Sequence, residues 1–171
     1  NIPARWGNLS AQEMVLRFWT GMVVGTYVGH GETFLDPHDV LWWSKGGVLH
    51  GQSPARLAFL KKIFDDAPPG GINPIDKWEE IAISGRPGEY YLAYFGQEVR
   101  PSWKFELFHT GLEEGMKFSV EVIDTWNMTI TRVPQVFEIK KLNDYQFGDA
   151  HGASVALPGK PYMAIRIERV D

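Results

Sequence analysis

Cysteine is absent from the 171-residue sequence, and so are long apolar runs and any excess of positive charge. Without cysteine the chain can form no disulfide and has no thiolate chemistry. The compartment stays open between cytoplasmic and secreted, because many exported proteins also lack cysteine. No run approaches the roughly 20 apolar residues that a membrane-spanning helix needs. The net charge of −4 offers no basic surface, so we expect neither nucleic acid nor a membrane as a partner.

Aromatic side chains, by contrast, are abundant: seven Trp, six Tyr and ten Phe. Several of them take part in helical patterns within the first 75 residues. Ser10 and Glu13 have capping-box spacing and predict a helix over 11–23, whose apolar residues recur at helical intervals. A second helix is expected to begin near Ser53 and Pro54, because Ser is a preferred N-cap and Pro is favoured in the first turn.

Between these helices, the segment 26–28 (Thr-Tyr-Val) is β-branched and aromatic, which predicts a short buried strand followed by a long loop. The order helix, strand, loop, helix is typical of an α/β barrel, in which the loops after the strands carry the active site. This pattern ends at the Asp-Asp-Ala-Pro-Pro-Gly-Gly linker, 65–71.

After residue 76 the sequence changes to short strand-like runs separated by turn residues, which indicates an antiparallel β-sandwich. We therefore predict two domains, 1–75 and 76–171. The predicted fold class is α+β, with the last strand and helix units of a (β/α)8 barrel followed by an antiparallel β-sandwich. The expected strands are 80–84, 90–95, 103–108, 118–123, 128–132, 136–140, 153–157 and 163–170.

Glu32 would follow the predicted strand, on the side where barrel enzymes place their active sites. Glycosidases need two carboxyl groups across the scissile bond, about 5 Å apart for retention and wider for inversion, and only one candidate is visible here. Glu32 could instead bind loop amides or pair with a neighbouring cation. His30 and His50 are candidates for hydrogen bonds to the loop or to ligand hydroxyls. Together with His38 they match no zinc spacing, so we expect no metal.

Trp42 and Trp43 are adjacent, and successive side chains alternate in an extended segment, so one would pack inward while the other could line a cleft. The apolar faces of sugar rings stack on indoles, which makes either Trp a candidate sugar platform. A place in the core is the alternative for both. The predicted substrate-binding residues are therefore His30, Glu32, Trp42, Trp43 and His50.

Trp126 lies near the tip of a predicted tight turn between two strands, with Asp124 and Asn127 supplying turn hydrogen bonds. An exposed Trp at this position could bind a ligand. It could also dock the second domain on the first, and we favour docking.

Residues 1–13 (NIPARWGNLSAQE), 27–33 (YVGHGET) and 41–51 (LWWSKGGVLHG) resemble the last part of the catalytic barrel in a group of bacterial glycoside hydrolases. Residues 90–96, 123–131 and 157–167 are similar to the small C-terminal β-domain that follows that barrel and that has been labelled a collagen-binding module. The resemblance covers nearly the whole chain and implies hydrolysis of glycosidic bonds by two carboxylates without a cofactor.

The resemblance also implies that both catalytic carboxylates lie upstream of residue 1. We therefore assign no catalytic residue, expect this chain alone to be inactive, and expect the N-terminal part of the barrel as a partner beside the carbohydrate substrate. Two functions stay open. The chain is either the C-terminal part of a glycoside hydrolase or a non-catalytic β-sandwich module that binds carbohydrate or protein.

Overall fold

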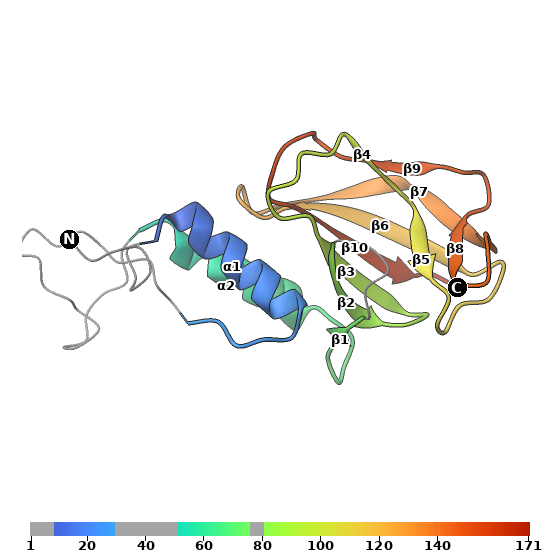
Figure 1. Ribbon diagram of the computed structural model, residues 1–171, viewed down its shortest axis with the longest axis horizontal. Coiled ribbons are helices and arrows are strands. Elements are labelled where there is room, and N and C mark those ends of the chain that lie inside the picture. Colours follow the sequence, from blue (N-terminus) through green and yellow to red (C-terminus); the bar gives the residue numbers. More distant parts are fainter. Residues whose placement is uncertain (1–8, 30–50, 76–80) are drawn as a thin grey trace, which may run out of the picture.

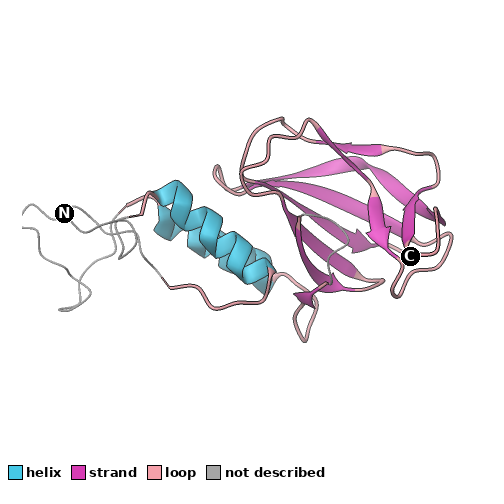
Figure 2. Ribbon diagram, viewed as in Figure 1, coloured by secondary structure: helices cyan, strands magenta, loops and turns pink. Residues whose placement is uncertain are grey.

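The computed structural model describes residues 9–29, 51–75 and 81–171, and these ranges contain two helices and ten strands (Figure 1). The helices lie together on one side and the strands make up the rest (Figure 2). The elements are α1 (Ala11–Val23), α2 (Ser53–Asp65), β1 (Asn73–Pro74), β2 (Ala82–Arg86), β3 (Tyr90–Tyr94), β4 (Ser102–Lys104), β5 (Glu106–Phe108), β6 (Lys117–Asp124), β7 (Thr129–Lys141), β8 (Gln146–Asp149), β9 (Ser154–Ala156) and β10 (Met163–Arg169).

The first predicted helix is confirmed as α1. The side chain of Ser10 caps it by accepting a hydrogen bond from the Glu13 N–H at 3.1 Å, which satisfies one of the unpaired amides of the first turn. The Glu13 carboxylate accepts a hydrogen bond from Arg17 Nε at 2.6 Å, one turn further on. The buried side of α1 consists of Ala11, Met14, Val15, Trp19, Gly21 and Val23.

The second predicted helix is confirmed as α2, with a different cap. Ser53 lies inside the helix, and the N-cap position belongs to Gln52, whose side chain makes no capping hydrogen bond. Leu60 and Ile63 are buried. Neither described helix has the length and apolar character needed to cross a membrane.

The predicted strand over 26–28 is wrong, and the predicted barrel end is wrong with it. Tyr27 is fully exposed, and Thr26 turns the chain back onto α1. The N–H and the hydroxyl of Thr26 both donate to the Gly21 carbonyl oxygen, at 2.8 and 3.1 Å. A β-branched segment becomes a strand only where a neighbouring strand pairs with its backbone. The described residues show no alternation of helices and strands, so the α+β prediction is replaced by a mostly β domain with two helices.

One curled antiparallel sheet replaces the predicted two-sheet sandwich. Its eight strands follow the order β1-β2-β3-β10-β6-β7-β8-β5, and β4 and β9 form a separate pair. The long strand β7 allows the sheet to curl, because its first part pairs with β6 and its end pairs with β8. Between Val136, which faces Ser119, and Arg132, which faces Glu121, three residues of β7 oppose one of β6. This bulge contains Pro134, which has no N–H to give to a ladder.

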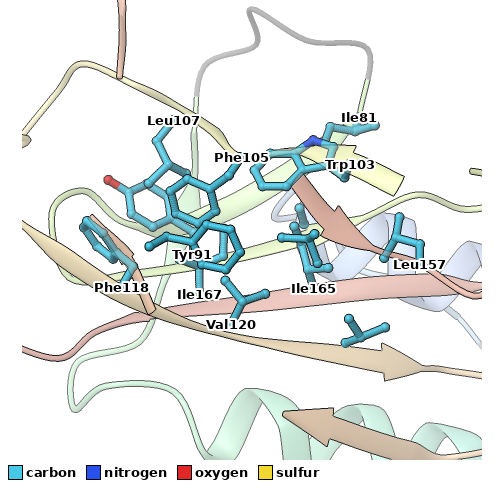
Figure 3. Packing of buried hydrophobic residues seen from close by; sticks show 14 of the residues in the cluster. Ile81, Tyr91, Trp103, Phe105, Leu107, Phe118, Val120, Leu157, Ile165 and Ile167 are labelled. Carbon is cyan, nitrogen blue, oxygen red and sulfur yellow. The ribbon is translucent and has the colours of Figure 1, made fainter. Parts of the chain in front are cut away.

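An apolar core fills the inner face of the curled sheet (Figure 3). Phe105 stacks on Phe137 with ring centroids 4.5 Å apart and meets Trp103 edge-on at 5.8 Å. Tyr91 also belongs to this core, and its hydroxyl accepts a hydrogen bond from the Gly88 N–H at 2.8 Å. The polar atom that Tyr91 brings into the core is therefore satisfied.

The helices cover the opposite face of the sheet. Because side chains alternate along a strand, Tyr90, Leu92 and Tyr94 of β3 face the helices while the residues between them face the inner core. Trp19 of α1 packs on Tyr94 with ring centroids 5.3 Å apart. Every residue of β3 is consequently buried.

Arg86, at the end of β2, holds the connection between α2 and the sheet. Its Nη2 donates to the carbonyl oxygens of Pro69 and Gly71, and its Nη1 donates to Glu89 at 3.0 Å. Gly70 and Gly71 have φ angles of 93° and 78°, which glycine adopts without steric cost. The connection therefore follows a defined course along β2.

Candidate functional site

The predicted substrate-binding residues lie outside the described residues. This applies to His30, Glu32, Trp42, Trp43 and His50 alike, so their predicted role stays a prediction. In the sequence they fall between α1 and α2. The contacts that hold these two helices in place are therefore relevant to the segment that contains the predicted residues.

The turn between β6 and β7 contains a polar network, and Asp124 is at its centre. Asp124 Oδ1 accepts hydrogen bonds from the backbone N–H groups of Trp126 and Asn127, at 3.1 and 2.9 Å. Its Oδ2 accepts from the Asn127 side-chain amide at 2.7 Å and lies 2.5 Å from Lys160 Nζ. The side chain of Asp124 is nine-tenths buried, so these four contacts replace its water.

These contacts determine the protonation state of Asp124. Burial alone would raise its pKa, but the hydrogen bonds from Lys160 and Asn127 more than offset that effect, and the net result is a lowered pKa. Asp124 is therefore ionised at neutral pH. Its role is to fix the turn, because a glycosidase acid needs the opposite shift, a raised pKa.

Trp126 docks on α2, which confirms the favoured interpretation of this turn. The Arg56 guanidinium lies 3.7 Å from the centroid of the Trp126 ring, and Arg56 Nε donates to the Trp126 carbonyl oxygen at 2.8 Å. The indole also packs against the apolar cluster between helices and sheet. Arg56 thus combines a cation–π contact with a hydrogen bond close to the start of α2.

The other end of α2 is held by Arg166 of β10. Its Nε donates to Glu121 of β6 at 2.8 Å, and Nη1 lies 3.7 Å from the carboxylate of Asp66, the C-cap of α2. Burial alone would lower the pKa of Arg166, but Glu121 outweighs burial and raises it. A hydrogen bond from Lys62, reinforced by Arg166, lowers the pKa of Asp66. Tyr90 lies beside this cluster, and burial raises its pKa to about 12.

A groove opens on the other side of the β6–β7 turn. Thr129 faces Asp124 across the ladder and Thr131 faces Val122, and directly opposed residues share a face of the sheet. Val122 belongs to the inner core, so both threonines lie on the inner face. Together with the segment 156–160 they line a hollow of about 390 Å³, which we call the β7 groove. Its lining is Val122, Asp124, Thr129, Thr131, Arg132, Val133, Pro134, Ala156, Leu157, Pro158, Lys160 and Met163.

Two smaller hollows occur elsewhere. One, of about 270 Å³, lies beside β1 and includes Asn73, Arg86 and Thr110. The other, of about 160 Å³, includes Lys104, Lys140 and Asp149. Asp149 Oδ2 accepts two backbone hydrogen bonds, while its buried Oδ1 has no partner among the described residues. The described part of the chain holds no group of three His, Asp or Glu residues suited to a metal ion.

The described residues thus define an antiparallel β-domain with a docked helix pair. Residues 78–168 match the family described as Domain of unknown function (DUF5605), and the chain belongs to that family. No curated protein matches the chain.

Two solved structures to which the chain is similar are described as glycoside hydrolases. A protein from Bacteroides vulgatus ATCC 8482, provisionally assigned as a glycoside hydrolase, is 35% identical with a TM-score of 0.88, over 99% of this chain and 34% of that one. A second solved glycoside hydrolase is 13% identical with a TM-score of 0.56, over 95% of this chain and 37% of the other, which shows likeness of fold alone. The chain therefore spans about a third of the length of these two proteins.

Proposed function

We propose that this chain is a non-catalytic accessory part of a longer glycoside hydrolase, and that its sheet holds the helices flanking a substrate-contacting segment. The anchoring of α2 at both ends carries this proposal. Arg56 joins the start of the helix to Trp126, and Arg166 joins its end to the sheet beside Asp66. Two separated polar contacts restrict both the position and the rotation of a helix, which apolar packing alone does less well.

In this proposal the catalytic carboxylate pair belongs to a part of the enzyme outside this chain. The predicted residues of the segment between the helices would complete a sugar subsite. Asp66 and Asp124 have lowered pKa values, so neither of these two carboxyl groups suits the role of a general acid.

A turnover assay on chromogenic glycosides tests the division of labour. We expect hydrolysis by the longer gene product and none by this chain. Glycosidase activity in this chain that disappears with Glu32→Gln would place catalysis here and refute the proposal.

A variant of α2 tests the anchoring role in the longer enzyme. Arg56→Met keeps the apolar stem but removes the cation–π contact and the hydrogen bond to Trp126. We expect kcat/KM to fall by roughly 5- to 30-fold, mainly through KM, because each of the two lost contacts is worth about 1 kcal/mol. Lys61→Met on the same helix is the matched control, since the Lys61 side chain is 74% exposed. The proposal is contradicted if both variants are equally active while amide exchange of α2 is faster in Arg56→Met alone. That result would mean that the anchoring of α2 does not affect activity.

The alternative is a binding module in which the β-domain itself takes up a ligand. The observation that favours it is the β7 groove, which combines apolar and polar lining. Glycan binding by this chain without turnover, together with unchanged activity of the longer enzyme in Arg56→Met, would support the alternative.

A further inference from the structure

The β7 groove has the composition of a small polar-ligand site. Its apolar lining includes Val122, Val133, Leu157 and Met163, and Thr129 and Thr131 bring hydroxyl groups to the same lining. Ligand sites in proteins are mostly apolar with a few placed polar groups, and they occupy roughly 300–1,000 Å³. The volume of about 390 Å³ falls within this range. A sugar ring presents apolar C–H faces and hydroxyls at its edge, which matches such a lining.

The charges at the groove favour a neutral ligand. Lys160 is neutralised by Asp124, and the four contacts to the Asp124 oxygens leave that carboxylate saturated. Arg132 also borders the groove, but it faces Glu121 across the ladder, on the side of the sheet that faces the helices. Neither Lys160 nor Arg132 is therefore placed to bind an anionic ligand within the groove.

The open edge of β7 supplies further hydrogen-bonding groups. Within the described ranges, residues 129–132 pair with β6 on one side and with no strand on the other, and the bulge residues 133–135 have no ladder partner. A peptide strand could in principle add to such an edge. The bulge and Pro134 oppose that addition, because they interrupt the row of backbone donors. Individual hydroxyl groups of a sugar need no continuous ladder.

The wall of the groove opposite β7 is held in place. Tyr162 follows this wall with a φ of 64°, which is unusual for a bulky residue. Its N–H donates to the Gly96 carbonyl at 2.6 Å, and its own carbonyl accepts from the N–H and hydroxyl of Thr125, at 3.0 and 2.7 Å. A groove with fixed walls loses little conformational freedom when it binds a ligand.

We propose that the β7 groove binds a neutral oligosaccharide, with Thr129 and Thr131 donating or accepting hydrogen bonds and Lys160 donating them to its hydroxyls. This site is separate from the contacts that anchor α2, so it adds a sugar-binding function to the proposed accessory role. The sugar-binding proposal is tested by a binding measurement on this chain. The accessory role is tested by turnover experiments on the longer enzyme, so failure of one proposal can be distinguished from failure of the other.

Saturation-transfer NMR and calorimetry with gluco-, xylo-, manno- and galacto-configured trisaccharides test the proposal, with trigalacturonate as an anionic comparison. We expect at least one neutral trisaccharide to bind, with amide shift changes at Thr131 and Val133. Thr131→Val keeps the shape and β-propensity of the side chain but removes the hydroxyl. It should weaken binding roughly 2- to 10-fold, the effect of one lost hydrogen bond.

Thr110→Val is the matched control, because Thr110 lines the hollow beside β1. It should leave binding unchanged. Thr131→Trp should fill the groove and abolish binding while preserving the melting temperature within a few degrees. If Thr131→Trp unfolds the chain, the comparison of the two valine variants decides. The proposal is overturned if no neutral trisaccharide binds, if trigalacturonate binds more tightly, or if Thr110→Val weakens binding as much as Thr131→Val.

Discussion

The two faces of the curled sheet bury side chains in different ways. On the inner face, the buried hydroxyl of Tyr91 has its hydrogen-bond partner, and among the described residues one buried polar atom, Asp149 Oδ1, has none. On the helix-facing side, four buried polar atoms have no partner among the described residues. They are Trp19 Nε1, Ser84 Oγ, Tyr90 OH and Tyr94 OH. Unsatisfied polar atoms cost stability, so the inner face behaves as the folding core and the other face as a docking interface that stabilises less per residue.

The largest effect should come from the inner face. Phe105→Ala removes a ring that is 1% exposed and stacks on Phe137, and it leaves a cavity that a rigid core fills poorly. We expect a loss of about 3–5 kcal/mol in the free energy of unfolding, measured by urea denaturation. A loss below about 1.5 kcal/mol would mean that the inner core is loosely packed.

Two tyrosines of β3 give a matched pair across the sheet. Tyr91→Phe leaves the Gly88 N–H without its acceptor and should cost about 1–3 kcal/mol. Tyr94→Phe removes a buried hydroxyl without a hydrogen-bond partner among the described residues, since the nearby Thr125 hydroxyl donates its proton to the Tyr162 carbonyl oxygen. It should change stability by less than about 0.5 kcal/mol or increase it. Both are checked by urea denaturation. Equal losses for the two variants would remove the distinction between the faces.

The smallest effect should be a dependence on acid. The pKa of Asp124 in the folded chain is below its ordinary value of 3.8, so the folded state binds fewer protons than the unfolded state. The stability that Asp124 contributes is therefore present above pH 3.8 and is lost as the pH falls through the folded pKa. Asp124→Asn should flatten the decline of the urea midpoint between pH 5 and pH 2.5.

Asp144→Asn is the control for this experiment, because the Asp144 side chain is 86% exposed and pairs only with Lys141 among the described residues. Its decline should stay close to that of the unchanged chain. A steeper decline in Asp124→Asn than in the parent would contradict the lowered pKa of Asp124 in the folded chain.

Local patterns predicted the regular elements well wherever a single face was buried. The capping of α1 by Ser10 and the alternation in β6 and β10 were visible in the sequence. The break at Pro134 was expected to end a strand, but the bulge carries β7 through it. The run 103–108 was expected to be one strand, but it is interrupted at Phe105. The part before Phe105 pairs with β9 as strand β4, and the part after it pairs with β8 as strand β5. Strand β8 was missed, because its four residues have little periodicity.

Long-range contacts were beyond prediction from a single sequence. Trp126 could be singled out as a docking residue, yet nothing in its neighbourhood points to Arg56, which is 70 positions away. The roles of Lys160 and Arg166 depend equally on pairings made by folding. The strand expected at 26–28 failed for the same reason, since its pattern was suitable but no strand among the described residues pairs with it. The division at residue 75 and the substrate-binding set at 30–50 stay predictions.

The clasp of Arg86 on the carbonyl oxygens of Pro69 and Gly71 has a consequence for cooperativity. These hydrogen bonds connect the segment that follows α2 to strand β2. If that segment were a free linker, the helices could detach while the strands stayed folded. The helix pair and the sheet should accordingly melt in one transition. Force applied to the helices would then reach the strands directly, so the two layers act as a single mechanical element.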